Sequence, residues 1–367
     1  MNGKSQFEGV VVRESLWAGL DTGAETSRLC VINGELAPVL DATLNSTAEE
    51  IIAALAPSRA HIVEIAAEAT SSSIPLARGL RDAGYRVILY EAWQVSRYLR
   101  VRRNKTDNND ARGLAELAKL QLPSMRPVYL KSLEAQRLRA KLQFRHKLLR
   151  QRLTCENMMR SLIRLHGGGK VKPGHVAWTV ERNVRAALDT VRGETGIDLS
   201  DDVLPLLDLA VAIRHFVERL DKDFVALARA HPVCSRFLQI PGVGPICAIS
   251  FYTAVEDPFR FAHAADIGPY LGLTPKVRQS GTSRRHGHIS KLGNLLTRSH
   301  LVMAATILMQ DKMDDMPLKA WALSLAERAG SGKARVALAR RLAVIMLAMW
   351  KNGSEFDEML PSPHRDG

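Results

Sequence analysis

The chain has 367 residues, of which 46% are hydrophobic and 24% charged, a balance typical of a globular protein with a buried core. Lys and Arg number 51 against 38 Asp and Glu, so the formal net charge of +13 favours a polyanionic partner, most simply nucleic acid. The four scattered cysteines form no CxxC pair and no apolar run approaches the about 18 residues of a membrane span, so we expect a protein of the reducing cytoplasm without a zinc site, disulfide framework or membrane contact.

The first elements read as a β-meander followed by a helix. Residues 1–14 are expected to form a loose leader. Short apolar runs bounded by turn-forming residues predict strands at residues 16–21, 27–33 and 35–44. Capping residues followed by acids then predict a helix at residues 45–55.

Strands and helices alternate in the next segment. A buried strand is predicted at residues 61–69, a helix closed by a glycine at residues 74–84, a further strand at residues 85–92 and an Ala- and Leu-rich helix at residues 106–120. Antiparallel strands that lead into parallel ones indicate a mixed sheet. The N-terminal domain is therefore predicted to be α/β.

Four carboxylates lie where this arrangement could bring them together. Asp21 ends the first strand and Glu68 the fourth, and ligands of such sheets gather at the C-terminal ends of the strands. Asp107 and Asp110 are three residues apart and therefore share one face of a helix. Converging carboxylates repel one another unless a divalent cation lies between them, and paired metal ions stabilise both oxygens in phosphodiester cleavage.

Each of these acids also has a simpler explanation. An acid at a strand end is often solvated, and acids in the first turn of a helix complement the helix dipole. The identity of the second acid is open as well, because Glu64 lies earlier on the same face of the strand as Glu68.

A basic helix follows a linker at residues 121–130. Residues 131–165 contain neither Pro nor Gly and carry ten Lys or Arg against two acids, with an apolar stripe at Leu138, Leu142, Leu149 and Leu153. The charge can form the solvated face of a helical hairpin or lie against phosphates, where it contributes affinity without reading sequence. The residues that we expect to bind nucleic acid are Arg137, Arg139, Lys141, Arg145, Lys147 and Arg150.

A glycine-rich break at residues 167–174 ends this helix, and a polar region follows. A second apolar-periodic helix is predicted at residues 204–230. It could pair antiparallel with the basic helix or with a copy in another subunit.

The stretch at residues 237–255 resembles a helix-hairpin-helix. Gly242 and Gly244 permit a tight turn there, and their amides could approach a DNA phosphate closely. A simple turn between two helices is the alternative.

The C-terminal part is predicted to be helical around a basic loop. A short helix near residues 262–267 precedes the loop, and helices are predicted at residues 295–310, 317–328 and 333–351 before a frayed polar tail. The loop is expected to be mobile and to face an anion. Its charged residues are Lys276, Arg278, Arg284, Arg285, His286, His288 and Lys291.

Taken together, four motifs resemble one family. They are GLD at 19–21, AEATSS at 67–72, KTDNNDA at 105–111 and GLTPKVRQSG…GHISKLGN at 272–294, and they are similar to those of the DEDD transposases of the IS110 insertion-sequence family, relatives of the Piv-type DNA invertases. The resemblance implies an RNase H-like (RuvC-like) catalytic domain at 1–125, a basic helical coiled-coil spacer at 126–231, an all-α C-terminal transposase domain at 232–352 and a tail at 353–367.

The resemblance also implies a chemistry. Asp21, Glu68, Asp107 and Asp110 would bind Mg²⁺, and Ser280 would be the nucleophile that forms a covalent link to DNA, with Ser283 as the nearby alternative. The residues that would steady phosphate charge are Arg284, Arg285 and Lys291. Members of the family use a structured bridge RNA that pairs with donor and target DNA, and they assemble as dimers that pair into tetramers. A nucleoid-associated location is expected as well.

Two alternatives remain from the residues alone. The acids could serve a RuvC-like structure-specific nuclease that uses water and needs no serine. Alternatively, the chain could be a non-enzymatic nucleic-acid-binding protein with structural carboxylates.

Overall fold

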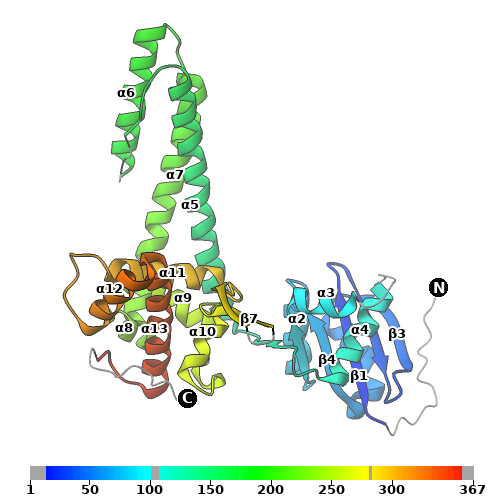
Figure 1. Ribbon diagram of the computed structural model, residues 1–367. Coiled ribbons are helices and arrows are strands. Elements are labelled where there is room, and N and C mark those ends of the chain that lie inside the picture. The colour runs from blue at the N-terminus through cyan, green and yellow to red at the C-terminus, as the bar shows by residue number, and fades with distance from the viewer. Residues whose placement is uncertain (1–13, 101–106, 173, 175, 281–282, 358–367) are drawn as a thin grey trace. The chain divides into compact units, whose positions relative to one another are not determined.

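The computed structural model describes residues 14–100, 107–172, 174, 176–280 and 283–357, with residues 107, 108, 277–280 and 283–286 limited to their backbone. The predicted leader lies almost wholly outside the described residues. The chain divides into two compact units, Met1–Lys131 and Ser132–Gly367, each with its own core (Figure 1). No helix within the described ranges is long and apolar enough to cross a membrane.

The first unit is built on a six-stranded mixed sheet with the order β3-β2-β1-β4-β5-β6. The first three strands form an antiparallel meander, β1, β4 and β5 run parallel, and β6 is an antiparallel edge. The strands are β1 (Leu16–Thr22), β2 (Thr26–Ile32), β3 (Pro38–Asn45), β4 (Ile62–Glu68), β5 (Val87–Tyr90) and β6 (Pro127–Val128). The predicted mixed sheet is confirmed.

Helices cover both faces of this sheet. They are α1 (Ala48–Leu55), a 3₁₀ turn (Ala56–His61), α2 (Ser73–Asp82), α3 (Ala92–Leu99) and α4 (Asp107–Leu120). Side chains alternate along a strand, so Ala18 and Leu20 of β1 pack with α1 and α2, whereas Gly19 faces α4. Neighbouring Ala66 of β4 also packs against α4.

Two elements of this unit were not expected. The strand predicted at residues 85–92 is shorter, Val87–Tyr90, and the unpredicted helix α3 begins at Ala92, directly after its N-cap residue Glu91. The stretch predicted as a linker contains β6, which pairs with β5. Pro127 is tolerated there because an edge strand leaves one side without a ladder partner.

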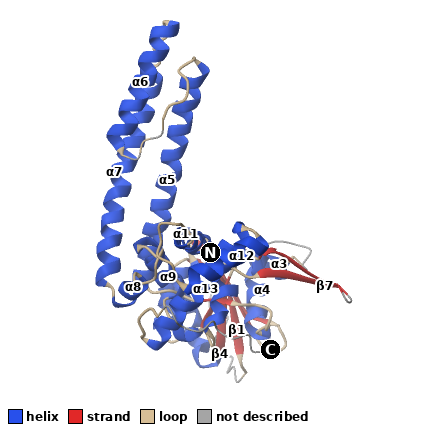
Figure 2. Cartoon of the chain, turned by 60° about the vertical axis from the view of Figure 1, so that its left-hand side comes forward, coloured by secondary structure: helices blue, strands red, loops and turns tan. Residues whose placement is uncertain are grey.

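The second unit is mainly helical. Its helices are α5 (Leu133–Leu165), α6 (Ala177–Thr195), α7 (Ser200–Ala230), α8 (Pro232–Phe237), α9 (Pro245–Val255), α10 (Ile267–Tyr270), α11 (Leu295–Leu308), α12 (Pro317–Ala329) and α13 (Ser331–Asn352). Helices α5 and α7 lie side by side as a long hairpin (Figures 1 and 2). Of the two pairings left open for residues 204–230, the structure contains the one within the chain.

Two cores hold this unit. At the base of the hairpin, Leu142 of α5 and Phe224 of α7 join the cluster formed by α9, α11 and α13. Further along the hairpin, a separate cluster joins Met159 of α5 to α6 and to Val203 of α7. Leu153 is 50% exposed, so the apolar stripe predicted on α5 does not continue inward at that position.

One prediction for this unit was wrong and two were incomplete. The region after the glycine-rich break, predicted only to be polar, contains the helix α6, whose buried residues Val180, Val184 and Leu188 recur at helical spacing. The basic segment is not a loop but a β-hairpin, β7 (Pro275–Ser280) and β8 (Ser283–Ile289), so this part of the chain is not all-α. The short helix expected near residues 262–267 is present as a 3₁₀ helix (Ala264–Asp266), and α10 continues it to Tyr270.

Candidate active site

Asp21 and Glu68 lie at the same edge of the sheet. Strands β1 and β4 are parallel neighbours in which Leu20 is paired with Ala67, so each acid follows its strand's paired residue by one position. Just beyond, the hydroxyl oxygens of Thr22 and Thr70 are 3.2 Å apart and hydrogen-bonded. The two strand ends are therefore held together at the point where the acids occur.

Helix α4 runs antiparallel to β1 across this sheet. A Cβ atom added to Gly19 would lie 2.0 Å from the carbonyl oxygen of Ala111, so the helix packs directly on the strand backbone. Near the other end of α4, the Lys119 ammonium lies 5.6 Å from the centre of the Trp17 ring, at the start of β1. The first turn of α4, with Asp107 and Asp110, is therefore directed toward the strand end that carries Asp21.

Glu64, a residue of β4, lies beside the C-terminal end of α4. Its side chain is fully buried, its Oε2 lies 3.0 Å from Arg86 Nε, and Gln121, just after α4, donates to that oxygen at 3.1 Å. Burial raises the pKa of the Glu64 carboxyl, although the Arg86 charge opposes the shift. Of the two candidates for the second acid, Glu68 is the one placed beside Asp21.

Of the four carboxylates, those of Asp21, Glu68 and Asp110 are described, and together they do not form a metal-binding group. Among the side chains that the structure describes, no three His, Cys, Asp or Glu residues are close enough to hold a metal ion. The side chain of Asp107 lies outside that description. The fold thus brings together the three elements that carry the acids, while the three described carboxylates do not meet at one metal-binding point.

The predicted nucleophile lies in the second unit. Ser280 is the last residue of β7, and its backbone is paired with Ser283, the first residue of β8. Arg284 and Arg285 follow on β8, paired with Gln279 and Arg278. Their side chains lie outside the described part of the structure, whereas Lys291, beyond the hairpin, is exposed with a left-handed φ of 57°.

Two family models match the chain over these same segments. Residues 18–166 match a model of the DEDD transposases of IS110 elements, described as "Transposase", and residues 234–317 match "Transposase IS116/IS110/IS902 family". A probable family 20 transposase of Pseudomonas aeruginosa is 30% identical over 78% of this chain and 83% of its own length. The chain belongs to the IS110 family of transposases.

Two further relatives are also named transposases. The transposase for insertion sequence element IS1111A of Coxiella burnetii is 32% identical over 68% of this chain and 67% of its own length. A putative transposase of Sinorhizobium fredii is 29% identical over 94% of this chain and 86% of its own length. The matched segments of this IS110-family transposase contain all four acids and Ser280, whereas α6 and α7 lie between them.

The basic residues of α5 do not form one uniform face in this transposase. Arg137, Lys147 and Arg150 are exposed, and Lys141 is half-buried. The Arg145 guanidinium instead forms a two-pronged ion pair with Asp221 of α7, with Nη2 donating to Oδ2 at 2.9 Å. Burial lowers the pKa of Arg139. Arg145 therefore links the two helices of the hairpin, and the fully exposed charge of this set comes from Arg137, Lys147 and Arg150.

The stretch at residues 237–255, predicted to resemble a helix-hairpin-helix, contains a turn followed by α9, and α8 ends at its first residue, Phe237. Gly242 has a φ of 84°, and a Cβ atom there would lie 2.6 Å from the carbonyl oxygen of Ala304 on α11. Close packing thus explains this glycine without a phosphate. Gly244 caps α9 and has no atom within 4 Å of the Cβ position, so its approach to a phosphate stays a prediction.

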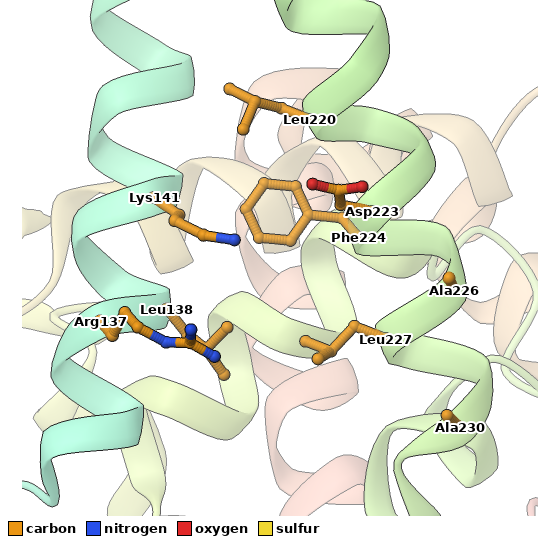
Figure 3. A pocket seen from close by; sticks show the side chains of 9 residues that line it. All are labelled: Arg137, Leu138, Lys141, Leu220, Asp223, Phe224, Ala226, Leu227 and Ala230. Atoms are coloured by element: carbon orange, nitrogen blue, oxygen red, sulfur yellow. The ribbon is translucent and has the colours of Figure 1, made fainter.

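A cavity of about 370 Å³ lies between α5 and α7 (Figure 3). Its walls are mostly apolar, with charged groups from both helices at the rim. The lining residues are Arg137, Leu138, Lys141, Leu220, Asp223, Phe224, Ala226, Leu227 and Ala230. All of them belong to the second unit, whereas Asp21 and Glu68 belong to the first.

Proposed function

We propose that this IS110-family transposase cuts and rejoins DNA through a serine-linked intermediate at a site formed by Asp21, Glu68, Asp107 and Asp110. The observation that carries the proposal is the pairing of Leu20 with Ala67, which puts Asp21 and Glu68 at the ends of neighbouring parallel strands. The antiparallel course of α4 supports including the other two acids.

The donor set fits Mg²⁺. Carboxylate oxygens are the ligands that this hard cation prefers, and it commonly takes only a few of them from protein. Bound there, it would neutralise phosphate charge and lower the pKa of a coordinated hydroxyl. Rotation of the acidic side chains about the strand ends and the first turn of α4 would bring their oxygens together, since a cation offsets their mutual repulsion.

In the covalent step, Ser280 is the proposed nucleophile. Its Oγ loses a proton and attacks the scissile phosphorus, forming an O–P bond while the bond from phosphorus to the leaving strand's oxygen breaks and that oxygen takes up a proton. Attack by the hydroxyl of another strand reverses these changes and rejoins the DNA. Cationic side chains at Arg284, Arg285 and Lys291 balance the phosphate charge.

The proposed partners are donor and target DNA and a bridge RNA, with a dimer-to-tetramer assembly. The net charge of +13 and the exposed Arg137, Lys147 and Arg150 suit contacts to nucleic-acid backbones. Base pairing with the RNA would then supply sequence recognition while the protein holds the backbone.

Adduct trapping tests this function. Labelled element-end DNA is incubated with the protein, its RNA and Mg²⁺, and the mixture is denatured to reveal DNA that remains attached to protein. We expect an adduct with the natural protein and none with Ser280→Ala, while Ser283→Ala retains it. Asp21→Asn and Glu68→Gln should abolish cutting.

Two outcomes would replace the proposal. Cutting by Ser280→Ala without any adduct would favour a RuvC-like nuclease that uses water. Recombination that survives Asp107→Asn combined with Asp110→Asn would assign those acids an architectural role.

A further inference from the structure

An exposed tryptophan stands at the start of α3. The side chain of Trp93 is 44% exposed. Its indole Nε1 donates to the Glu91 carboxylate, and the Arg97 guanidinium lies 5.2 Å from the ring centre. The ring is therefore held in one orientation by residues of its own segment while much of it contacts solvent.

The helix that carries Trp93 is anchored by other residues. Gln94 and Val95 are buried, and the Gln94 side chain bonds the backbone of Arg126 twice, accepting from its N–H at 2.9 Å and donating to its carbonyl at 3.0 Å. Trp93 is thus not needed to fix α3 on the sheet. A rigid helix presents the ring outward.

The helix that carries this ring begins two residues after the strand position paired with Glu68. Strand β5 is parallel to β4 with Tyr90 paired to Glu68, and the Ala69 N–H donates to the Tyr90 carbonyl at 2.7 Å. Trp93 follows Tyr90 by three residues. Arg97 and Arg100 are exposed on the same segment and give this surface positive charge.

We infer that Trp93 and Arg97 form a stacking platform for an unpaired DNA base beside the acids. Cutting a strand and joining it to another requires base pairs at the cut to open, and an aromatic ring backed by a guanidinium accepts any exposed base face. The inference rests on the proposed function, which places the cut DNA at this edge.

Trp178 offers a matched control. It is 61% exposed on α6, and Arg182, four residues later, lies 4.9 Å from its ring centre, which reproduces the Trp93–Arg97 arrangement in the second unit.

The experiment measures the binding affinity of full-length variants in the presence of a chelator. The ligands are a fully paired DNA oligonucleotide, a DNA oligonucleotide with an unpaired stretch and a single-stranded RNA of equal length.

We expect Trp93→Ala to weaken binding of the unpaired DNA about tenfold, within the range measured for one stacked base. Trp93→Phe should retain most of the affinity, and Trp178→Ala should match the natural protein. A 2-aminopurine placed in the unpaired stretch should be quenched by the natural protein and by Trp93→Phe, and much less by Trp93→Ala.

An equal loss on fully paired DNA, a loss on RNA alone, or an equal loss with Trp178→Ala would overturn the inference. A melting curve would reveal whether Trp93→Ala unfolds. In that case the quenching of 2-aminopurine by the natural protein is compared with the quenching by Arg97→Gln. Equal quenching by these two proteins would overturn the stacking platform. These binding measurements contain no divalent metal. A cutting assay in which the acid variants remain active would contradict the proposed function, and it would leave the binding result unchanged.

Discussion

At Gly19, helix α4 packs directly on the backbone of the sheet. Added to this residue, a Cβ atom would meet the backbone of Ala111 at 2.0 Å and of Ala115 at 2.3 Å, and backbone cannot rotate away as a side chain can. We expect Gly19→Ala to lower the free energy of unfolding by about 1–3 kcal/mol or more, as overpacking does. Displacement of α4 should also reduce DNA cutting beyond the loss of folded protein.

Gly34→Ala is the matched control, because no atom lies within 4 Å of its Cβ position. Urea unfolding and cutting assays on both variants check the prediction. Equal stability of the two variants would show that α4 does not bear on Gly19 in solution.

Glu64 should make the stability depend on pH. Its folded-state pKa is raised above the ordinary value of 4.5 by burial, so the folded protein holds this proton more tightly than the unfolded chain. The stabilisation that Glu64 gives the folded protein through this proton is therefore complete below pH 4.5, and it declines as pH rises through the folded-state pKa. Relative to Glu64→Gln, which stays neutral, the natural protein should become less stable across that window, as urea unfolding at several pH values would show. A constant difference would contradict this.

The same residue shows what the sequence could not decide. Glu64 and Glu68 lie on one face of β4, so periodicity treats them alike. What separates them is the direction of α4, whose end at Gln121 meets Glu64 and whose beginning approaches the edge with Asp21. That direction is a tertiary property. Both strand-end acids and the acidic pair on the helix could nevertheless be identified from the residues alone.

At the scale of the elements, the α5–α7 hairpin contains an ion pair, called the clamp below, in addition to its apolar contacts. Arg145 bonds Asp221 through two nitrogens, and their side chains are 19% and 39% exposed. A double-mutant cycle with Arg145→Ala and Asp221→Ala should give a coupling of about 1 kcal/mol, since two-pronged, partly buried pairs exceed ordinary surface pairs. The pair Arg192–Asp198, at 3.5 Å and 70% and 48% exposed, should give almost none. Equal coupling in both cycles would refute the clamp.

Elements with strong apolar periodicity or clear capping residues were predictable from the sequence. Elements that lack both signals, such as α3 and the β7–β8 hairpin, were not. The meander, β4, α4 and α5 follow from apolar spacing and capping residues. Helix α3 was missed because one extended residue, Glu91, separates it from β5. The β7–β8 hairpin was missed because its Ser, Gly and Arg residues lack apolar alternation, so strand pairing there reflects backbone register more than side-chain pattern.

At the scale of the whole molecule, the positive charge should govern how tightly DNA is held. With a formal net charge of +13, affinity should fall steeply as salt rises, because each phosphate contact releases condensed counterions. Exposed Lys147 and Arg150 on α5 are the residues expected to make such contacts. Replacing either by Ala should lower the slope of log affinity against log salt by about one, with similar losses on DNA of any sequence.

Lys333→Ala is the control, since Lys333 is also an exposed cation, on α13, and carries no predicted contact. All three variants lose one positive charge, so a general effect of net charge would change the three slopes alike. A smaller slope for Lys147→Ala and Arg150→Ala alone, measured by fluorescence anisotropy between low and moderate salt, would assign the contact to α5. Three identical slopes would mean that the phosphates lie elsewhere, and that the charge on α5 serves only to solvate the hairpin.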